Sequence, residues 1–379
     1  MIKRYLDAAI TQSLRRSSVL KKKIPNPAVP RELMSLQSTC EQKLDEVASR
    51  LRYLLEDKLI NQDQFSKERI RFFRRYTEDL DELELGVSAL IRANEDDVFM
   101  NRLVFKIHQE INYPIYPPVV SCISKDYFWI NTRLRLLAVP PVEADFLLHM
   151  PDLYHEMAHM ILSETSNPKT EPLRESLSDF YMDVEAYFQN KIEENRKLTG
   201  PKEYFEQILM NLRDSWIMHW APEIFCDLYA VATLGPAYAW SHFHLSASKC
   251  PNPFRVNVQG LMSHPPDHAR METLLVALRQ LGYTSASDEI TKRWTELLNL
   301  NGARIDGDYR KACPEHLLEK SVDHALTGVK GIRANTKEDM DKECVGYLLN
   351  EAWRTFWQSP ADYPENEARL IVRLRKAAA

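Results

Sequence analysis

Hydrophobic residues recur at steps of three and four from Leu33 onward, which places them along one side of a helix. The first such series is Leu33, Leu36, Cys40, Leu44, Val47, Leu51 and Leu54. The polar stretch INQDQ interrupts it, and a second series follows with Phe65, Phe72, Phe73, Tyr76, Leu80 and Leu83. Two adjacent amphipathic helices predict an antiparallel hairpin over residues 33–100. Apolar stripes of this kind usually serve packing, and binding of a partner protein by the hairpin is the alternative.

The residues before this hairpin, 1–32, have a different character. They are basic and contain the segment KKKIPNPAVP. This composition predicts a solvated, partly flexible N-terminal arm. A docking arm for an acidic partner is the alternative interpretation.

The pattern changes near residues 112–141, where prolines, β-branched residues and aromatic residues cluster. Strand periodicity appears there, with apolar and more polar residues alternating at Phe128, Ile130, Thr132, Leu134 and Leu136. The segment SKDY before them is a candidate turn between two strands. After Pro151 nearly the whole chain has helical periodicity, so we predict a mostly helical α+β fold with a small β-sheet.

Composition narrows the classes of function. Charged residues make up 27% of the chain and hydrophobic residues 44%, which is typical of a soluble globular protein. The net charge of −5 gives no general attraction to nucleic acid or to anionic membranes. With ten glycines and no glycine-rich loop, the chain lacks a phosphate-binding fingerprint. Without a signal peptide, a transmembrane segment or a CxxC pair, we expect a cytoplasmic protein with reduced thiols.

The segment LYHEMAHMIL carries two histidines four residues apart. On a helix, His155 and His159 lie on nearly the same face, about 6 Å apart along the axis. They can therefore bind one zinc ion at about 2.0–2.1 Å. Glu156, one position further round, can accept a proton from water that the ion has made acidic, which is the logic of the HExxH motif. A helix with two hydrogen-bonded histidines and no metal is the alternative.

A catalytic zinc ion takes three protein ligands and leaves one position for water, so the motif requires a third ligand. Two segments have the form Glu-x-x-x-Asp, namely ESLSD, which contains Glu175, and EIFCD, which contains Glu223 and Asp227. We favour Glu223, because its segment is strongly apolar and a buried acidic pair there requires a metal or hydrogen bonds. Asp227 follows one helical turn later and can orient a ligand histidine. Glu175 lies in a more polar segment and is the alternative ligand.

A third cluster, MSHPPDHAR, contains His264, His268 and Arg270. Proline fixes the backbone after His264. A histidine or an arginine near the zinc ion can stabilise the oxyanion of a tetrahedral intermediate. The same segment also fits a surface loop without a catalytic role.

HEMAH, EIFCD and SHPPDHAR, in this order, resemble the motifs of the gluzincin zinc metallopeptidases, in particular the HtpX-like and prenyl-protein-processing endopeptidases. The resemblance covers roughly residues 126–270. It implies zinc ligands at His155, His159 and Glu223. It also implies that Glu156 is the general base, that Asp227 supports a ligand histidine and that His264 contacts the transition state. His268 and Arg270 are further candidates for substrate or transition-state contacts.

The resemblance also implies a zincin-like catalytic domain, which we place at residues 101–280, with a C-terminal helical region at 281–379. In such enzymes a strand before the metal-binding helix lies at the edge of the cleft and binds extended substrate. The candidates for this strand are Phe128, Ile130 and Thr132. Those relatives usually carry membrane helices, which this sequence lacks, so a prenylated or membrane substrate does not carry over.

The sequence therefore predicts a soluble zinc metallopeptidase that acts on a protein or peptide substrate. Two other classes stay open, namely a zincin-like module that binds peptides or partners without cutting them, and a hydrolase of a non-peptide amide. The intact Glu156 argues against a module that does not cut, because such a module has no need of a general base. A helical scaffold without metal is the remaining alternative.

Overall fold

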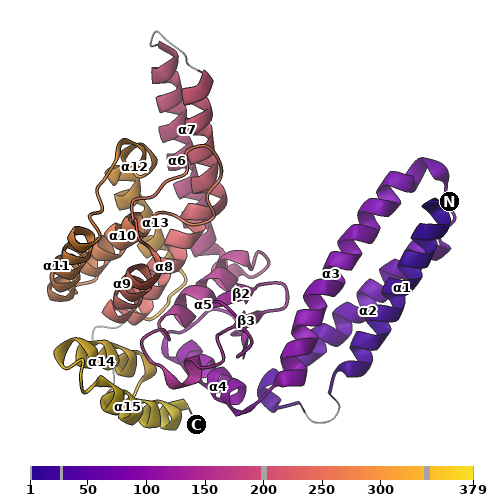
Figure 1. The fold of residues 1–379 in the computed structure, drawn as a ribbon, viewed down its shortest axis with the longest axis horizontal. Coiled ribbons are helices and arrows are strands. Elements are labelled where there is room, and N and C mark those ends of the chain that lie inside the picture. Colours follow the sequence, from indigo (N-terminus) through magenta and orange to yellow (C-terminus); the bar gives the residue numbers. More distant parts are fainter. Residues whose placement is uncertain (1, 26–28, 198–202, 337–341, 379) are drawn as a thin grey trace. The chain divides into compact units, whose positions relative to one another are not determined.

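The computed structural model describes residues 2–25, 29–197, 203–336 and 342–378 (Figure 1). The chain is mostly helical with one small β-sheet, which confirms the predicted fold class. It forms two compact units. The first unit contains Met1–Arg102 and Pro118–Ala144, and the second contains Leu103–Pro117 and Asp145–Ala379.

Three long helices form most of the first unit: α1 (Ile2–Lys23), α2 (Met34–Glu56) and α3 (Ser66–Arg92). Each packs against the other two. Helices α2 and α3 approach closely, because a Cβ atom on Gly86 would lie 2.7 Å from Sγ of Cys40. The predicted hairpin is confirmed as α2 and α3, and their apolar stripes form the core of this unit.

Residues 1–32 contain a long helix where the sequence predicts a partly flexible arm. Helix α1 buries apolar residues at Leu6, Ile10 and Leu20. The prediction of an arm is wrong for α1, because two of its buried positions, Ser13 and Ser17, are polar and conceal the helical stripe. The Ser17 hydroxyl donates a hydrogen bond of 3.2 Å to the backbone oxygen of Leu44 in α2. Residues 26–28 of the KKKIPNPAVP segment lie outside the described residues.

The sheet of the first unit has the strand order β1-β3-β2. Its strands are β1 (Val119–Ser121), β2 (Trp129–Asn131) and β3 (Leu136–Ala138), with β3 parallel to β1 and antiparallel to β2. The predicted single strand from Phe128 to Leu136 is wrong, because the chain turns between β2 and β3, where Arg135 has a φ of 53°. Of the three candidates for the substrate strand, only Ile130 lies in β2, and Phe128 and Thr132 flank it.

Helices make up the second unit, as the sequence predicts for the chain after Pro151. They are α5 (Asp152–Ser163), α6 (Glu171–Lys197), α7 (Glu203–Ser215), the π-helix η5 (Trp216–Trp220), α8 (Ala221–Leu234), α9 (Pro236–Lys249), α10 (Asp267–Gln280), α11 (Thr284–Leu300), α12 (Gly307–Ala312), α13 (Glu315–Gly331), α14 (Val345–Gln358) and α15 (Tyr363–Ala378). Helix α8 is central, because it packs against α5, α6, α9, α10 and α13. None of the described helices combines the length and the apolar character needed to cross a membrane.

The two units differ from the predicted domains. Residues 118–144 belong to the first unit and not to a catalytic domain at 101–280. Residues 281–379 belong to the second unit, in which α13 packs against α6, α8 and α10. The division itself falls within α4 (Glu95–Glu110), an uninterrupted helix, so the sequence has no linker that would mark it.

Candidate metal centre

Helix α5 presents the two histidines of HEMAH from the interior of the second unit. Its residues Leu153, Tyr154 and Met157 are buried, so the helix is enclosed by protein on most sides. Two hydrogen bonds fix its position. The Ser241 hydroxyl donates to Asp152 at 2.8 Å, and the Tyr113 hydroxyl donates to the backbone oxygen of Met157 at 2.7 Å.

Helix α8 packs directly against α5 and supplies the acidic residues of EIFCD. It begins after the π-helix η5 and ends at Gly235, whose φ of 88° favours glycine. Glu223 and Asp227 lie one turn apart on α8. Asp227 is fully buried, and 15% of the Glu223 side chain is exposed.

The structure brings His155, His159 and Glu223 together. Nε2 of His155 lies 3.2 Å from Nε2 of His159. The Glu223 carboxylate oxygens lie 3.4 Å from Nε2 of His155 and 3.5 Å from Nε2 of His159. Among the described residues, this is the one group of three or more histidine, cysteine or acidic side chains whose ligand atoms converge closely enough for a metal ion.

These distances fit a zinc ion. Three ligand atoms that bind one tetrahedral zinc ion at about 2.0–2.1 Å lie about 3.3–3.4 Å from one another. The three distances here range from 3.2 to 3.5 Å. Two imidazoles and one carboxylate are also a ligand set found in catalytic zinc sites.

The hydrogen bonds of His155 orient its ring for the same purpose. Nδ1 lies 2.8 Å from Oδ1 of Asp227 and 3.0 Å from the Tyr238 hydroxyl. A carboxylate only accepts hydrogen bonds, so we assign the proton of neutral His155 to Nδ1. The lone pair of Nε2 then faces Glu223 and His159, and a cation between these electron-rich atoms would stabilise them.

The electrostatics of the cluster also favour a positive charge. Burial lowers the pKa of His155, but its hydrogen bonds to Asp227 and Glu223 outweigh burial and raise the pKa to about 10, so near pH 7 Nε2 holds a second proton that a bound metal ion would displace. Burial raises the pKa of Glu223, but the hydrogen bond from His155 and the neighbouring positive charges lower it to about 2. Burial and the charge on His155 together lower the pKa of His159 to about 4, so its imidazole is neutral near pH 7, as metal binding requires.

Asp227 lies at the centre of a buried hydrogen-bond network that the sequence predicts only in part. Arg270 of α10 donates two hydrogen bonds to the Asp227 carboxylate, at 2.7 and 2.6 Å. Tyr238 of α9 donates a third. Burial alone would raise the pKa of Asp227, but the charge and hydrogen bonds of Arg270 hold that pKa well below its usual range. Asp227 therefore stays ionised while it accepts the proton of His155 Nδ1.

Glu156 is buried beside the cluster and is 9% exposed. Burial raises the pKa of its carboxyl group to about 7, with the neighbouring Glu223 adding to the rise and His155 opposing it. A carboxyl group with a pKa near neutrality can take up and release a proton under physiological conditions.

The residues of the third predicted segment, MSHPPDHAR, have different surroundings. Arg270 belongs to the Asp227 network. His268 is buried in packing, where it accepts a hydrogen bond of 2.9 Å from Nε1 of Trp294 and lies 3.3 Å from Glu272. His264 is exposed, and Nδ1 of its ring lies 2.9 Å from the Ser263 hydroxyl.

The loop that carries His264 is anchored at two points on α8 and η5. Nε1 of Trp220 donates to the backbone oxygen of Met262 at 3.1 Å, and Arg270 pairs with Asp227. Trp220, Glu223 and Asp227 share one helix face, because they are spaced at steps of three and four. The chain on either side of His264 is therefore held by η5 and α8, the segments that lead to and carry Glu223.

Two further residues settle points that the sequence left open. The alternative ligand Glu175 is exposed on α6, and it is not in the converging group. Tyr238 was missed by sequence reasoning, although a signal existed. A tyrosine in the apolar segment GPAYAW is expected to be buried, and a buried hydroxyl group needs a hydrogen-bond partner.

Comparisons with known proteins identify no similar protein. No family model, no curated protein and no solved structure matches the chain.

Replacing Asp227 with asparagine is expected to weaken zinc binding about 10–100-fold, because the ring of His155 loses its anionic partner. The substitution also leaves the buried guanidinium of Arg270 without its counter-charge, so we expect a lower free energy of unfolding as well. Competition with a chelator of known affinity measures the first effect and thermal unfolding the second.

The matched control for Asp227→Asn is Asp179→Asn, at the corresponding and exposed position of the ESLSD segment. It should change neither property. Tyr238→Phe removes a single hydroxyl from the same network and should weaken zinc binding in the same direction with less loss of stability. Unchanged zinc affinity in both Asp227→Asn and Tyr238→Phe would mean that the network serves packing alone.

Proposed function

We propose that this chain is a zinc-dependent metallopeptidase of the gluzincin type. The observation that carries the proposal is the convergence of His155, His159 and Glu223 at tetrahedral spacing, with Glu156 next in sequence to the first ligand. His155, His159 and Glu223 would hold the zinc ion, which when bound supplies a Lewis acid and makes water more acidic. A peptidase of this type needs one further group, a general base.

Glu156 supplies the general base in this proposal. Its carboxylate takes a proton from the water that attacks the scissile carbonyl carbon and then passes it to the leaving amine nitrogen. Burial raises the pKa of Glu156 to about 7, and a zinc ion bound nearby would lower this pKa, which favours the carboxylate that accepts the proton. Burial of Glu156 keeps bulk water away from the transferred proton.

The Asp227 network has a positioning role in the proposed enzyme. Asp227 accepts the Nδ1 proton of His155, which leaves Nε2 free to bind the ion. Arg270 keeps Asp227 ionised and fixes its two oxygens, so the orientation of His155 is determined by α10 as well as by α8 and α9. No step of the reaction requires these groups to exchange a proton.

His264 is proposed to stabilise the oxyanion that develops on the substrate carbonyl oxygen. The attachment of its loop to η5 at Trp220 supports this role, and the exposure of His264 leaves the ring free to turn toward a bound substrate. His264→Ala should lower kcat/KM about 10²–10³-fold, with little change in zinc content. His316→Ala, at an exposed histidine of α13, is the control and should retain full activity. Equal activity of the two variants would remove His264 from the mechanism.

The substrate strand stays a prediction. The candidate residue Ile130 lies in β2 of the first unit, whereas the metal centre belongs to the second. An edge strand binds a peptide through backbone hydrogen bonds, so a structure with a bound peptide would test the role of β2. All six cysteines are thiols, and five of them are buried, which suits the reducing compartment in which we propose that the enzyme works.

Incubation of the zinc-loaded protein with a proteome-derived peptide library tests the proposed activity. We expect new peptide termini that depend on zinc, disappear with a chelator and return when zinc is added. Peptides that bind without being cut would favour the binding module. If small amides are hydrolysed while every peptide stays intact, the chain is a hydrolase of a non-peptide amide.

A further inference from the structure

A groove of about 520 Å³ lies on the first unit, on α3 and the turn before β3. Its lining residues are Lys67, Ile70, Arg71, Arg74, Arg75, Glu78, Asp79 and Arg133. Cationic side chains outnumber acidic ones in this lining, although the chain as a whole carries a net charge of −5. The groove therefore presents a local positive charge that the overall composition does not reveal.

The spacing of residues along α3 explains why the charge is concentrated. Lys67, Arg71, Arg74 and Arg75 follow one another at steps of four, three and one, which places them within an arc of about 100° on the helix. From Lys67 to Arg75 this basic stripe is about 12 Å long, at about 1.5 Å per residue. All four side chains are exposed.

The arginines of the stripe are not held by carboxylates, although the Arg71 guanidinium lies over the Phe72 ring, 5.5 Å from its centroid. Within the part of the chain that the structure describes, no ion pair joins Arg71, Arg74 or Arg75 to a carboxylate. Arg133 differs, because it pairs with Asp79 at 2.5 Å and with Glu82 at 2.8 Å. The guanidinium groups of the stripe are thus free to bind a ligand, and Arg133 is not.

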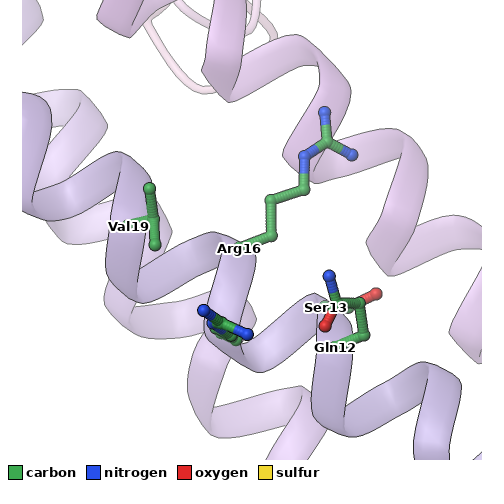
Figure 2. Close-up of a pocket in the computed structure, with 5 residues that line it drawn as sticks. Gln12, Ser13, Arg16 and Val19 are labelled. Carbon is green, nitrogen blue, oxygen red and sulfur yellow. The ribbon is translucent and has the colours of Figure 1, made fainter.

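A second groove of the first unit has fewer such arginines, because among the described residues only Arg15 of its lining is without an ion pair. It has a volume of about 400 Å³ and is lined by Gln12, Ser13, Arg15, Arg16 and Val19 of α1 (Figure 2). Figure 2 shows the Arg16 side chain extended away from α1. Its guanidinium pairs with Asp81 at 2.6 Å and also with Glu84, both on α3. The charge of Arg16 is therefore neutralised within the fold.

We propose that the groove on α3 binds an acidic peptide segment of a partner protein. Free guanidinium groups bind carboxylates through two parallel hydrogen bonds, which favours such a ligand. The length of the basic stripe matches about four residues of an extended peptide. A nucleic acid strand would continue past the stripe to the exposed carboxylate of Glu78, which repels its phosphates, whereas a short acidic peptide segment can end before it. This binding site is independent of hydrolysis at the metal centre.

Fluorescence anisotropy with the full-length protein tests this site. The probe is a fluorescein-labelled Gly-Ser-Glu-Glu-Glu-Glu-Ser-Gly peptide, and the same peptide with glutamine in place of glutamate is its control. Arg71→Glu combined with Arg74→Glu should weaken binding of the glutamate peptide at least about 10-fold at low ionic strength. Added salt should weaken binding to the wild type, because the charges are exposed.

The matched variant is Arg15→Glu combined with Lys22→Glu, which changes the net charge equally at exposed positions of α1. It should alter the affinity less than about 2-fold. Arg71→Gln with Arg74→Gln should fall between the wild type and the charge reversal. Circular dichroism checks that every variant remains helical.

Three results would overturn the proposal. One is equal weakening of peptide binding by the two charge-reversed variants, which would mean that the peptide responds to the net charge of the protein and not to the groove. Another is the absence of measurable binding of the glutamate peptide to the wild type. The third is a single-stranded oligonucleotide that binds more tightly than the peptide and displaces it, which would make the groove a nucleic-acid site.

Discussion

Glu156→Gln is expected to lower peptide hydrolysis about 10²–10⁴-fold, because glutamine keeps the size of the side chain but cannot act as a general base. The three metal ligands are untouched, so zinc content should equal that of the wild type. The fold should survive as well, since a neutral group replaces a buried carboxyl group whose pKa burial has already raised to about 7. Single-turnover cleavage of a peptide from the library measures the loss.

Glu164→Gln is the matched control for this prediction. Glu164 directly follows α5 and lies outside the metal cluster. Its substitution should leave both zinc content and hydrolysis unchanged. If Glu156→Gln retains zinc and also retains full hydrolysis, Glu156 is not the base. If it retains zinc and full biological function without any cleavage, the site works by binding.

Glu223→Gln is expected to abolish stoichiometric zinc binding at concentrations at which the wild type is saturated. Glutamine removes the negative charge that faces Nε2 of both histidines, at 3.4 and 3.5 Å. The loss of affinity should exceed the roughly 10–100-fold expected for residues that only support a ligand. Elemental analysis after dialysis against a weak chelator measures the zinc content.

The alternative ligand provides the control for Glu223→Gln. Glu175→Gln changes an exposed glutamate of α6 from the other Glu-x-x-x-Asp segment. It should bind zinc like the wild type. The reverse result, loss of zinc in Glu175→Gln and retention in Glu223→Gln, would move the third ligand to Glu175 in spite of its position.

The convergence of His155, His159 and Glu223 could be predicted from the sequence because its first part is local. His155, Glu156 and His159 lie within one turn of one helix, and their relative positions follow from helix geometry alone. Glu223 lies on another helix, but its apolar surroundings distinguish it from Glu175. A buried acidic pair needs hydrogen-bond partners or a metal ion, so we expected partners for Glu223 and Asp227. The structure places both residues beside His155.

The Asp227 network could not be predicted in full, because it depends on how three helices pack. Tyr238 and Arg270 lie on α9 and α10, and the sequence contains no spacing rule that joins them to Asp227. Arg270 was expected near the substrate, and it is instead held by a buried carboxylate. The exposed His264 lies on a loop. The contacts that hold the chain on either side of it, at Trp220 and Asp227, are not marked in the sequence.

Similar limits explain the errors in the first unit. Helix α1 has serine at two buried positions, so its stripe is weaker than those of α2 and α3. The alternation from Phe128 to Leu136 has the period of a strand, but the turn between β2 and β3 interrupts it. At that turn the side chain of Asn131 accepts a hydrogen bond of 2.8 Å from the backbone nitrogen of Leu134, an interaction that periodicity does not detect.

A crystal of the zinc-treated protein, measured on both sides of the zinc absorption edge, tests the central claim most directly. We expect one strong anomalous peak within about 2.0–2.2 Å of Nε2 of His155, Nε2 of His159 and a carboxylate oxygen of Glu223. Glu156 should lie near this peak without being a ligand. A zinc-saturated crystal whose anomalous peaks all lie away from His155 and His159 would contradict the assignment of the metal centre and the proposed peptidase with it.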